Sequence, residues 1–208
     1  MSLSYWNRTY AQWVYQYLLG QLNNNAIGVS ALMGNLYAES AICPYRCQGF
    51  NYNQSYDLTM NNFRQGTQAN FVGYTTNGGG YSLAQWTWHT RKANYYNFCT
   101  QALIGDETKS AEFIIWELNT TDYQSTLNVV TTTNDINYAT KYVMKNYESP
   151  ADQSQSAISR RQSYAREVYN DFSGLPPLPP MPQIPIFELF NYDEKKKRAL
   201  PINPNMLF

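Results

Sequence analysis

Hydrophobic positions recur at helical spacing over the first forty residues and predict two helices. In residues 4–22 the apolar positions return every three or four residues, and the asparagines at 23–25 interrupt this pattern. The same asparagines can cap a second helix at 26–40, because a side-chain oxygen there accepts free backbone N–H groups. Pro44 disfavours helical geometry in the residue before it, so we expect the second helix to stop near Cys43.

A long polar stretch separates these helices from the rest of the pattern. Residues 41–80 are rich in Asn, Gln, Gly and Tyr, and we predict a long functional loop there, with at most a short hairpin. No internal repeat and no other strand pattern is present, which predicts a mainly α fold. Apolar spacing and capping residues predict further helices at 82–103, at 107–119, from Asn134 or Asp135 to about 146, and at 153–172.

The composition changes abruptly at Gly174. Six prolines between 176 and 185 favour an extended polyproline conformation and exclude a helix. The residues that follow are apolar or basic and too few to form a core. We therefore predict one domain at 1–173, a proline-rich linker at 174–186 and a peptide at 187–208 that anchors the chain to a partner, or that is simply a disordered tail.

Composition and charge narrow the classes of function. Lys and Arg total 15 and Asp and Glu total 15, so the strong basic excess of a nucleic-acid-binding protein is absent. Only 14% of residues are charged and 16% are aromatic, including 19 tyrosines, which suits binding of uncharged carbohydrate; a biased genome would give the same composition. No apolar run approaches the roughly 20 residues that span a membrane. We expect no secretory signal, so a virion would have to deliver the protein to a cell wall.

Three cysteines leave an odd count, and no cofactor is expected. Cys43 and Cys47 could form a local disulfide, or all three thiols, including Cys99, could stay unpaired and packed. Together with His89 they could in principle bind zinc, but their spacing fits no common zinc site. We therefore predict no metal.

Glu39 is the first candidate for chemistry. It continues the apolar stripe of the helix at 26–40 and lies near the helix C-terminus. Burial and the negative end of the helix dipole both disfavour an ionised carboxylate, which is what a general acid requires. The alternative is that Glu39 ends the helix in solvent or pairs with Arg46 or Arg91.

A second segment, GGGYSLAQWTWHTRK at 78–92, supplies candidate binding groups. Gln85 can exchange hydrogen bonds with sugar hydroxyl and N-acetyl groups, and Tyr81 and Trp86 offer faces for stacking on a sugar ring. The alternative is that Trp86 and Trp88 belong to the core, which we expect for one of the two.

Taken together, these segments resemble the phage tail lysozyme family, a branch of the lysozyme superfamily close to goose-type lysozymes and lytic transglycosylases. GNLYAES resembles the family's helix ending in Glu-Ser, and GGGYSLAQWT resembles its Gly-Tyr-Gly-Leu-Ala-Gln-Trp-Thr motif, with Ser82 where the family usually has glycine. Arg91-Lys92, FIIWELNT and YESPADQSQSAISRRQSYA also look like family elements. The resemblance covers roughly residues 20–172.

The resemblance implies a lysozyme-like helical domain that cleaves the glycan strands of peptidoglycan. It implies that Glu39 protonates the glycosidic oxygen between N-acetylmuramic acid and N-acetylglucosamine. Ser40, Tyr81, Gln85 and Trp86 would then line the binding groove. It also implies a place in the phage tail, where residues 187–208 would contact other tail proteins, with no nucleic acid or membrane as partner.

The second carboxylate is open at this point. Inverting hydrolysis needs a base roughly 6.5–9.5 Å from the acid, and Asp57 in the polar stretch is the first candidate. Related transglycosylases act with one glutamate, so a second one need not exist. We expect Glu148 to cap or brace the closing helices.

Two other classes of function compete with this interpretation. One is a structural tail protein that keeps the fold without activity. The other is a cell-wall amidase or peptidase that uses Cys99 or Cys43 with His89, although no glycine-rich motif surrounds either cysteine.

Overall fold

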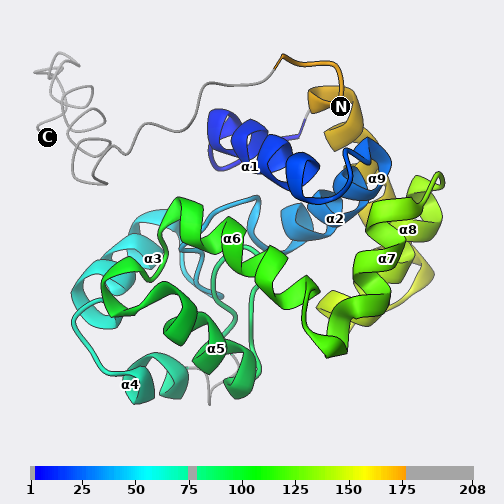
Figure 1. The fold of residues 1–208 in the computed structure, drawn as a ribbon. Helices are drawn as coiled ribbons and strands as arrows, with labels where there is room; N and C mark the ends of the chain where they lie inside the picture. The colour runs from blue at the N-terminus through cyan, green and yellow to red at the C-terminus, as the bar shows by residue number, and fades with distance from the viewer. Residues whose placement is uncertain (1–2, 75–78, 177–208) are drawn as a thin grey trace, which may run out of the picture. The chain divides into compact units, whose positions relative to one another are not determined.

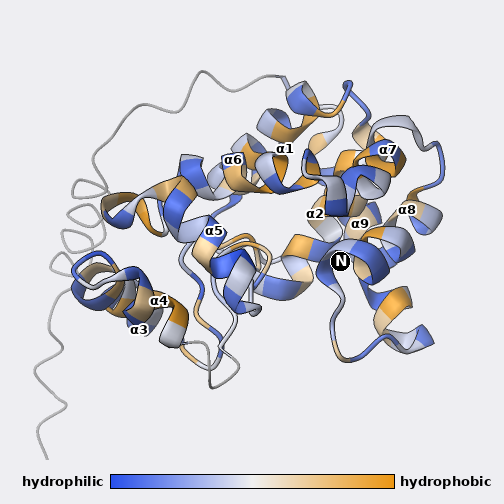
Figure 2. Ribbon diagram, turned by 60° about the horizontal axis from the view of Figure 1, so that its bottom comes forward, coloured by the Kyte–Doolittle hydropathy of each residue, from blue (hydrophilic) through white to orange (hydrophobic). Residues whose placement is uncertain are grey.

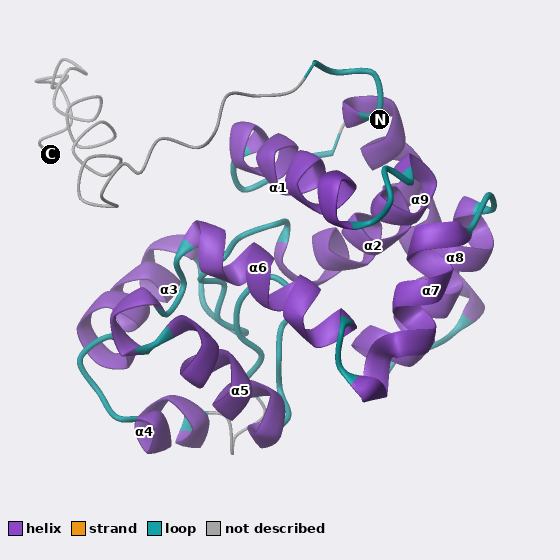
Figure 3. Cartoon of the chain, viewed as in Figure 1, coloured by secondary structure: helices purple, strands orange, loops and turns teal. Residues whose placement is uncertain are grey.

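The computed structural model describes residues 3–74 and 79–176, and this part of the chain is helical (Figure 3). Within it, isolated bridges join Cys47 to Tyr81 and Tyr81 to Trp86, and no strand is longer. The elements are α1 (Arg8–Gln21), α2 (Ala26–Ser40), α3 (Tyr52–Leu58), η1 (Thr59–Phe63), α4 (Gln68–Gly73), α5 (His89–Cys99), η2 (Gln101–Leu103), α6 (Glu107–Leu118), η3 (Thr121–Tyr123), α7 (Gln124–Thr132), α8 (Ile136–Val143), η4 (Met144–Glu148) and α9 (Gln155–Phe172). The mainly α prediction is confirmed.

Two groups of helices make up the described domain (Figure 1). In one, α2 packs against α7, α8 and α9; in the other, α3, η1, α4 and α5 pack in sequence. Helix α6 runs between them and contacts α5 on one side and α1 and α7 on the other. Hydrophobic and hydrophilic residues alternate around the helices in Figure 2, as expected when each helix buries one face.

Helix α2 forms over the residues that the sequence predicts. The side chain of Asn25 accepts a hydrogen bond from the backbone N–H of Gly28, and Ala41 ends the helix in the left-handed conformation. Ten of its residues are buried, because helices lie on several sides of it. This places the C-terminal end of α2, with Glu39 and Ser40, between the two groups of helices.

The predicted long loop at 41–80 is largely helical instead. Helices α3 and α4 each begin with a capping box, formed by Asn51 with Gln54 and by Thr67 with Asn70. Phe63 and Phe71 pack edge to face against each other and against Tyr81. The sequence pattern does not predict these helices, because their many Asn and Gln side chains cap and cover them without adding apolar periodicity.

The predicted helix at 82–103 begins only at His89. Before it, the chain makes a tight turn in which Ser82 and Gln85 adopt positive φ values of 66° and 45°. Glycine adopts the backbone conformation of Ser82 most easily, which agrees with the glycine that the family usually has at this position. This turn, and not a helix, carries the Leu-Ala-Gln-Trp segment.

Helices α7 and α8 precede η4, and α9 follows it. Helix α7 was not foreseen, and the predicted helix up to about 146 is divided into α8 and the π-helical turn η4. Helix α9 matches the predicted span at 153–172 closely. Ser149 then ends η4 in the left-handed conformation, with φ of 48°.

The described residues up to Pro176 form one compact unit, and the sequence predicts the end of the domain at 173. Gln16 donates a hydrogen bond to the carbonyl oxygen of Pro176, so the described chain stays attached to α1 up to that residue. Most of the linker predicted at 174–186 and all of the peptide predicted at 187–208 lie outside the described residues. No described helix is long and apolar enough to cross a membrane.

Candidate functional site

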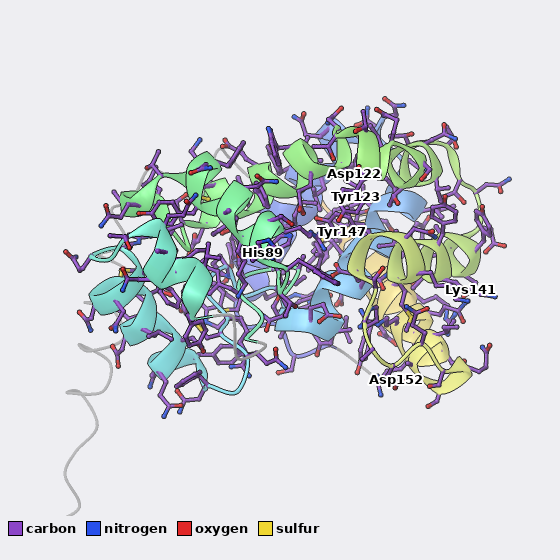
Figure 4. All side chains as sticks on the ribbon, turned by 90° about the horizontal axis from the view of Figure 1, so that it is seen from below. His89, Asp122, Tyr123, Lys141, Tyr147 and Asp152 are labelled. Carbon is purple, nitrogen blue, oxygen red and sulfur yellow. The ribbon has the colours of Figure 1, made fainter. Side chains whose placement is uncertain are left out.

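A pocket of about 830 Å³ lies where the end of α2, the turn before α5 and the turn after η4 meet. Figure 4 labels His89, which lines the pocket, and Tyr147, the buried neighbour of Glu148. The pocket is lined by Glu39, Gln48, Ala84, Gln85, Thr87, Trp88, His89, Arg91, Glu148, Ser149, Pro150 and Ala151. Its wall therefore combines two carboxyl groups, one arginine, one exposed tryptophan and several neutral polar groups.

Glu39 is held in this pocket by Arg161 of α9. The guanidinium lies 2.5 Å from Oε1 of Glu39, whose side chain is 20% exposed. The same guanidinium donates to the backbone and side-chain oxygens of Asn35, one turn earlier on α2. Of the alternatives left open by the sequence, neither Arg46 nor Arg91 forms this pair.

Arg161 was missed by sequence reasoning although a signal for it exists. It lies on the buried stripe of α9 together with Ile158, Ala165, Val168 and Phe172, and it is 6% exposed. A charged residue on such a stripe needs a partner, because burying an unpaired charge is costly. The partner is Glu39, 122 residues earlier in the chain.

Glu148 is the second carboxyl group of the pocket. Its Oε1 is buried and has no hydrogen-bond partner within the described structure. Burial, and then the charge of Glu39, raise the pKa of Glu148 well above its usual range, while Arg91 and Arg161 oppose this effect. We expected Glu148 to brace the closing helices; the structure places its side chain in the pocket.

A buried ion pair forms the base of the wall beside Glu148. Glu117 of α6 is 2% exposed and accepts two hydrogen bonds from Arg91, of 2.7 and 2.8 Å. Its Oε2 also accepts from the indole of Trp86 and the hydroxyl of Tyr147, at 2.7 and 2.8 Å. These contacts join α5, α6, η4 and the turn at 82–87, and so fix the position of the residue that follows Tyr147.

Tyr81 and Trp86 do not offer faces to a ligand, which corrects the prediction. They are 0% and 1% exposed, and their polar atoms are satisfied by Thr59 and Glu117. Trp88 is the exposed member of the pair of tryptophans, at 70%, and it lines the pocket. Within WTW, the two tryptophans are two residues apart and point to opposite environments.

The other predicted binding residues have different positions. Gln85 lines the pocket, and its amide donates to the carbonyl oxygens of Arg46 and Ser82. Ser40 is buried and donates to Leu83, so it joins α2 to the turn and does not line the pocket.

Asp57 is not brought to the pocket. It lies on the exposed side of α3 and is not among the lining residues. The structure thus offers Glu148, and not Asp57, as the carboxyl group that shares the site with Glu39.

A smaller pocket of about 460 Å³ adjoins the first one through Trp88 and Arg91. Trp116, which is 40% exposed, stacks on the core residue Phe113 and contributes one wall. Asp122 and Tyr123, labelled in Figure 4, also line it. Together the two pockets give a groove whose walls carry two exposed tryptophans.

The thiols are poorly suited to nucleophilic chemistry. Cys43, Cys47 and Cys99 are buried and free, and none lines the pocket with His89. Burial raises the pKa of Cys47 and of Cys99 to about 12, so the reactive thiolate is scarce at neutral pH. No group of three potential metal ligands occurs in residues 3–74 and 79–176.

Comparison with known proteins agrees with the motifs. No curated protein shows significant similarity to the chain. The family described as phage tail lysozyme matches residues 9–172, which include both walls of the pocket and the elements that position them. The chain therefore belongs to the phage tail lysozyme family, which indicates a lysozyme-like protein that acts on peptidoglycan and is associated with the phage tail.

Proposed function

We propose that this protein cleaves the β-1,4 bond between N-acetylmuramic acid and N-acetylglucosamine, with Glu39 as general acid. The observation that carries the proposal is the position of Glu39: a carboxyl group at the end of a buried helix, opening into a pocket of neutral polar and aromatic residues. In the phage tail, this activity would open the host cell wall during infection.

The surroundings of Glu39 suit a glycan strand. Gln48 and Thr87 can exchange hydrogen bonds with hydroxyl and N-acetyl groups, and Trp88 offers an exposed ring face for a sugar. The adjoining pocket extends this surface to Trp116. A pocket of about 830 Å³ lies in the usual size range of ligand sites, so the groove is large enough for sugar units beside Glu39.

The test replaces Glu39 with glutamine, which keeps the shape of the side chain and an oxygen that accepts from Arg161. We expect the rate of cell-wall cleavage to fall by a factor of roughly 10²–10⁴ or more, since the variant cannot donate a proton. Glu112→Gln is the matched control, because Glu112 lies on α6, pairs with Lys109 and does not line the pocket.

The rate of release of soluble fragments from purified cell walls measures the effect, and thermal unfolding confirms that both variants fold. Near wild-type cleavage by Glu39→Gln would overturn the assignment. Mass analysis of the fragments gives the outcome of the reaction: a reducing end shows hydrolysis and a 1,6-anhydro end shows transglycosylation.

A structural tail protein without activity is the alternative. The presence of Glu39 in the pocket with an arginine partner favours the enzyme, because a partly buried ion pair is weak evidence for stability alone. A zymogram on purified cell wall decides between the two.

A further inference from the structure

Among the described residues, Glu148 has no hydrogen-bond or ion-pair partner that explains its place in the pocket. The ion pairs of the described chain include Glu39 with Arg161 and Glu117 with Arg91, but none with Glu148. A buried carboxyl oxygen without a hydrogen bond lowers stability, and such groups in native proteins require an explanation. A purely bracing residue would be expected to form hydrogen bonds.

The backbone holds Glu148 at this point. It is the last residue of the π-helical turn η4, and Ser149 follows in the left-handed conformation. Single π-helical turns are frequent at functional sites, because the extra residue changes where the following side chain points. The hydrogen bond from Tyr147 to Glu117 fixes the turn from the other side.

The charges that face Glu148 come from four elements. Glu39 of α2 and Glu117 of α6 disfavour its ionised form, and Arg91 of α5 and Arg161 of α9 favour it. Both arginines already pair with the other two glutamates at 2.5–2.8 Å. Burial is the largest effect, so the net result is a pKa of Glu148 well above its usual range.

We propose that Glu39 and Glu148, which line the same pocket, act as a carboxyl pair in which Glu148 supplies the proton that Glu39 delivers to the substrate. In the absence of substrate the proton resides on Glu148, whose buried Oε1 has no hydrogen-bond partner among the described residues, while Glu39 pairs with Arg161. Glu148 then passes the proton to Glu39, and Glu39 passes it to the glycosidic oxygen as the C–O bond breaks. The nucleophile, water in hydrolysis or the 6-hydroxyl group in transglycosylation, adds to the anomeric carbon, and the proton that it releases returns to the carboxylate of Glu148. Glu148 is thus a positioning residue for a proton and acts through Glu39.

The first test measures wall cleavage and therefore rests on the proposed function. In Glu148→Gln we expect the alkaline limb of the pH profile of cleavage to move to lower pH by about one unit or more, because interacting groups titrate as a pair. Activity at acidic pH should be much less affected, and Glu148→Asp should restore part of the profile. A uniform loss at every pH would assign a structural role only, and an unchanged profile would also overturn the proposal.

A second readout is independent of activity. Because the pKa of Glu148 is raised in the folded state, its contribution to stability is fully present below the ordinary glutamate pKa of about 4.3 and is lost as pH rises through the folded value. Glu148→Gln should therefore unfold at a higher temperature than the wild type at pH 8, with the difference vanishing near pH 4.

Glu39→Gln should reduce the same pH-dependent loss, since it removes the charge that faces Glu148, whereas Glu112→Gln should leave it unchanged. A melting-temperature difference for Glu148→Gln that does not vary with pH would overturn the carboxyl pair, even if the protein proved to cleave no cell wall. Conversely, if the melting temperatures vary with pH as expected but the protein cleaves no cell wall, the carboxyl pair is supported and only the proposed function is refuted.

Discussion

At the scale of single residues, three glutamates of this domain show how surroundings set chemistry. Glu117 accepts four hydrogen bonds and serves structure. Glu39 has one arginine partner and faces the pocket. Glu148 faces the same pocket with a carboxyl oxygen that no described group satisfies. The number of hydrogen-bond partners thus distinguishes the structural carboxylate of Glu117 from those of Glu39 and Glu148, which remain available for chemistry.

The two tryptophans of the WTW segment give a prediction at this scale. Trp88→Ala should weaken binding of peptidoglycan oligosaccharides by roughly 2–12-fold, the equivalent of about 0.5–1.5 kcal/mol for an aromatic contact, with little change in melting temperature. Trp86→Ala should instead cost about 3–5 kcal/mol of unfolding free energy, because its indole is buried and donates to Glu117.

Calorimetric titration with soluble glycan fragments and thermal unfolding measure these two effects. A Trp88→Ala variant that binds as tightly as the wild type would remove this residue from the groove.

At the scale of elements, α2 sets the site because other helices approach it closely. A Cβ built on Gly28 would lie 1.8 Å from the carbonyl oxygen of Val130 in α7, and one on Gly34 would lie 2.6 Å from the backbone nitrogen of Ala165 in α9. These glycines let α7 and α9 pack directly on α2. The approach at Gly34 also brings Arg161, one turn before Ala165, to the level of Glu39.

Gly28→Ala should therefore destabilise the domain by about 1–3 kcal/mol or more, since the added methyl group meets backbone that cannot move aside. Gly20→Ala in α1 is the matched control, because a Cβ there meets nothing within 4 Å. The control should stabilise by about 0.5–1 kcal/mol through helix propensity. Equal effects of the two changes in denaturant unfolding would show that α2 and α7 do not pack as described.

At the scale of the whole molecule, the catalytic unit and the C-terminal peptide have separate roles in our proposal. Residues 1–176 form one compact unit that contains both pockets. We propose that residues 187–208, which carry apolar and basic side chains, fasten the enzyme to another tail protein. The proline-rich segment before them would act as a spacer.

Truncation after Pro176 tests this division. The truncated protein should keep its melting temperature and its rate of wall cleavage in solution, because the hydrogen bond from Gln16 to Pro176 is retained. It should be missing from assembled phage particles, as measured by immunoblotting of purified virions. Normal packaging would refute the anchor, and unfolding would show that the tail belongs to the domain.

Local sequence patterns predict much of the fold and one side of the site. The spans of α2, α6 and α9 follow from apolar spacing and capping residues, which are local properties of the chain. The Glu-Ser and Gly-Tyr-Ser-Leu-Ala-Gln-Trp-Thr segments led to the family, and Glu39 and Gln85 both line the pocket. Helices α3 and α4 were not predicted, because polar capping residues add no apolar periodicity to the sequence.

Which side chains meet depends on how the helices pack in three dimensions. Periodicity could not tell that Trp86 is buried and Trp88 exposed, because the turn at 82–87 reverses the chain before α5 begins. Periodicity also could not predict that Arg161 and Glu148 lie near Glu39, because more than a hundred residues separate them from it in the chain. Those contacts depend on how closely α9 packs on α2 and on where η4 ends, since the ionisation of a carboxyl group is set by the charges around it in space.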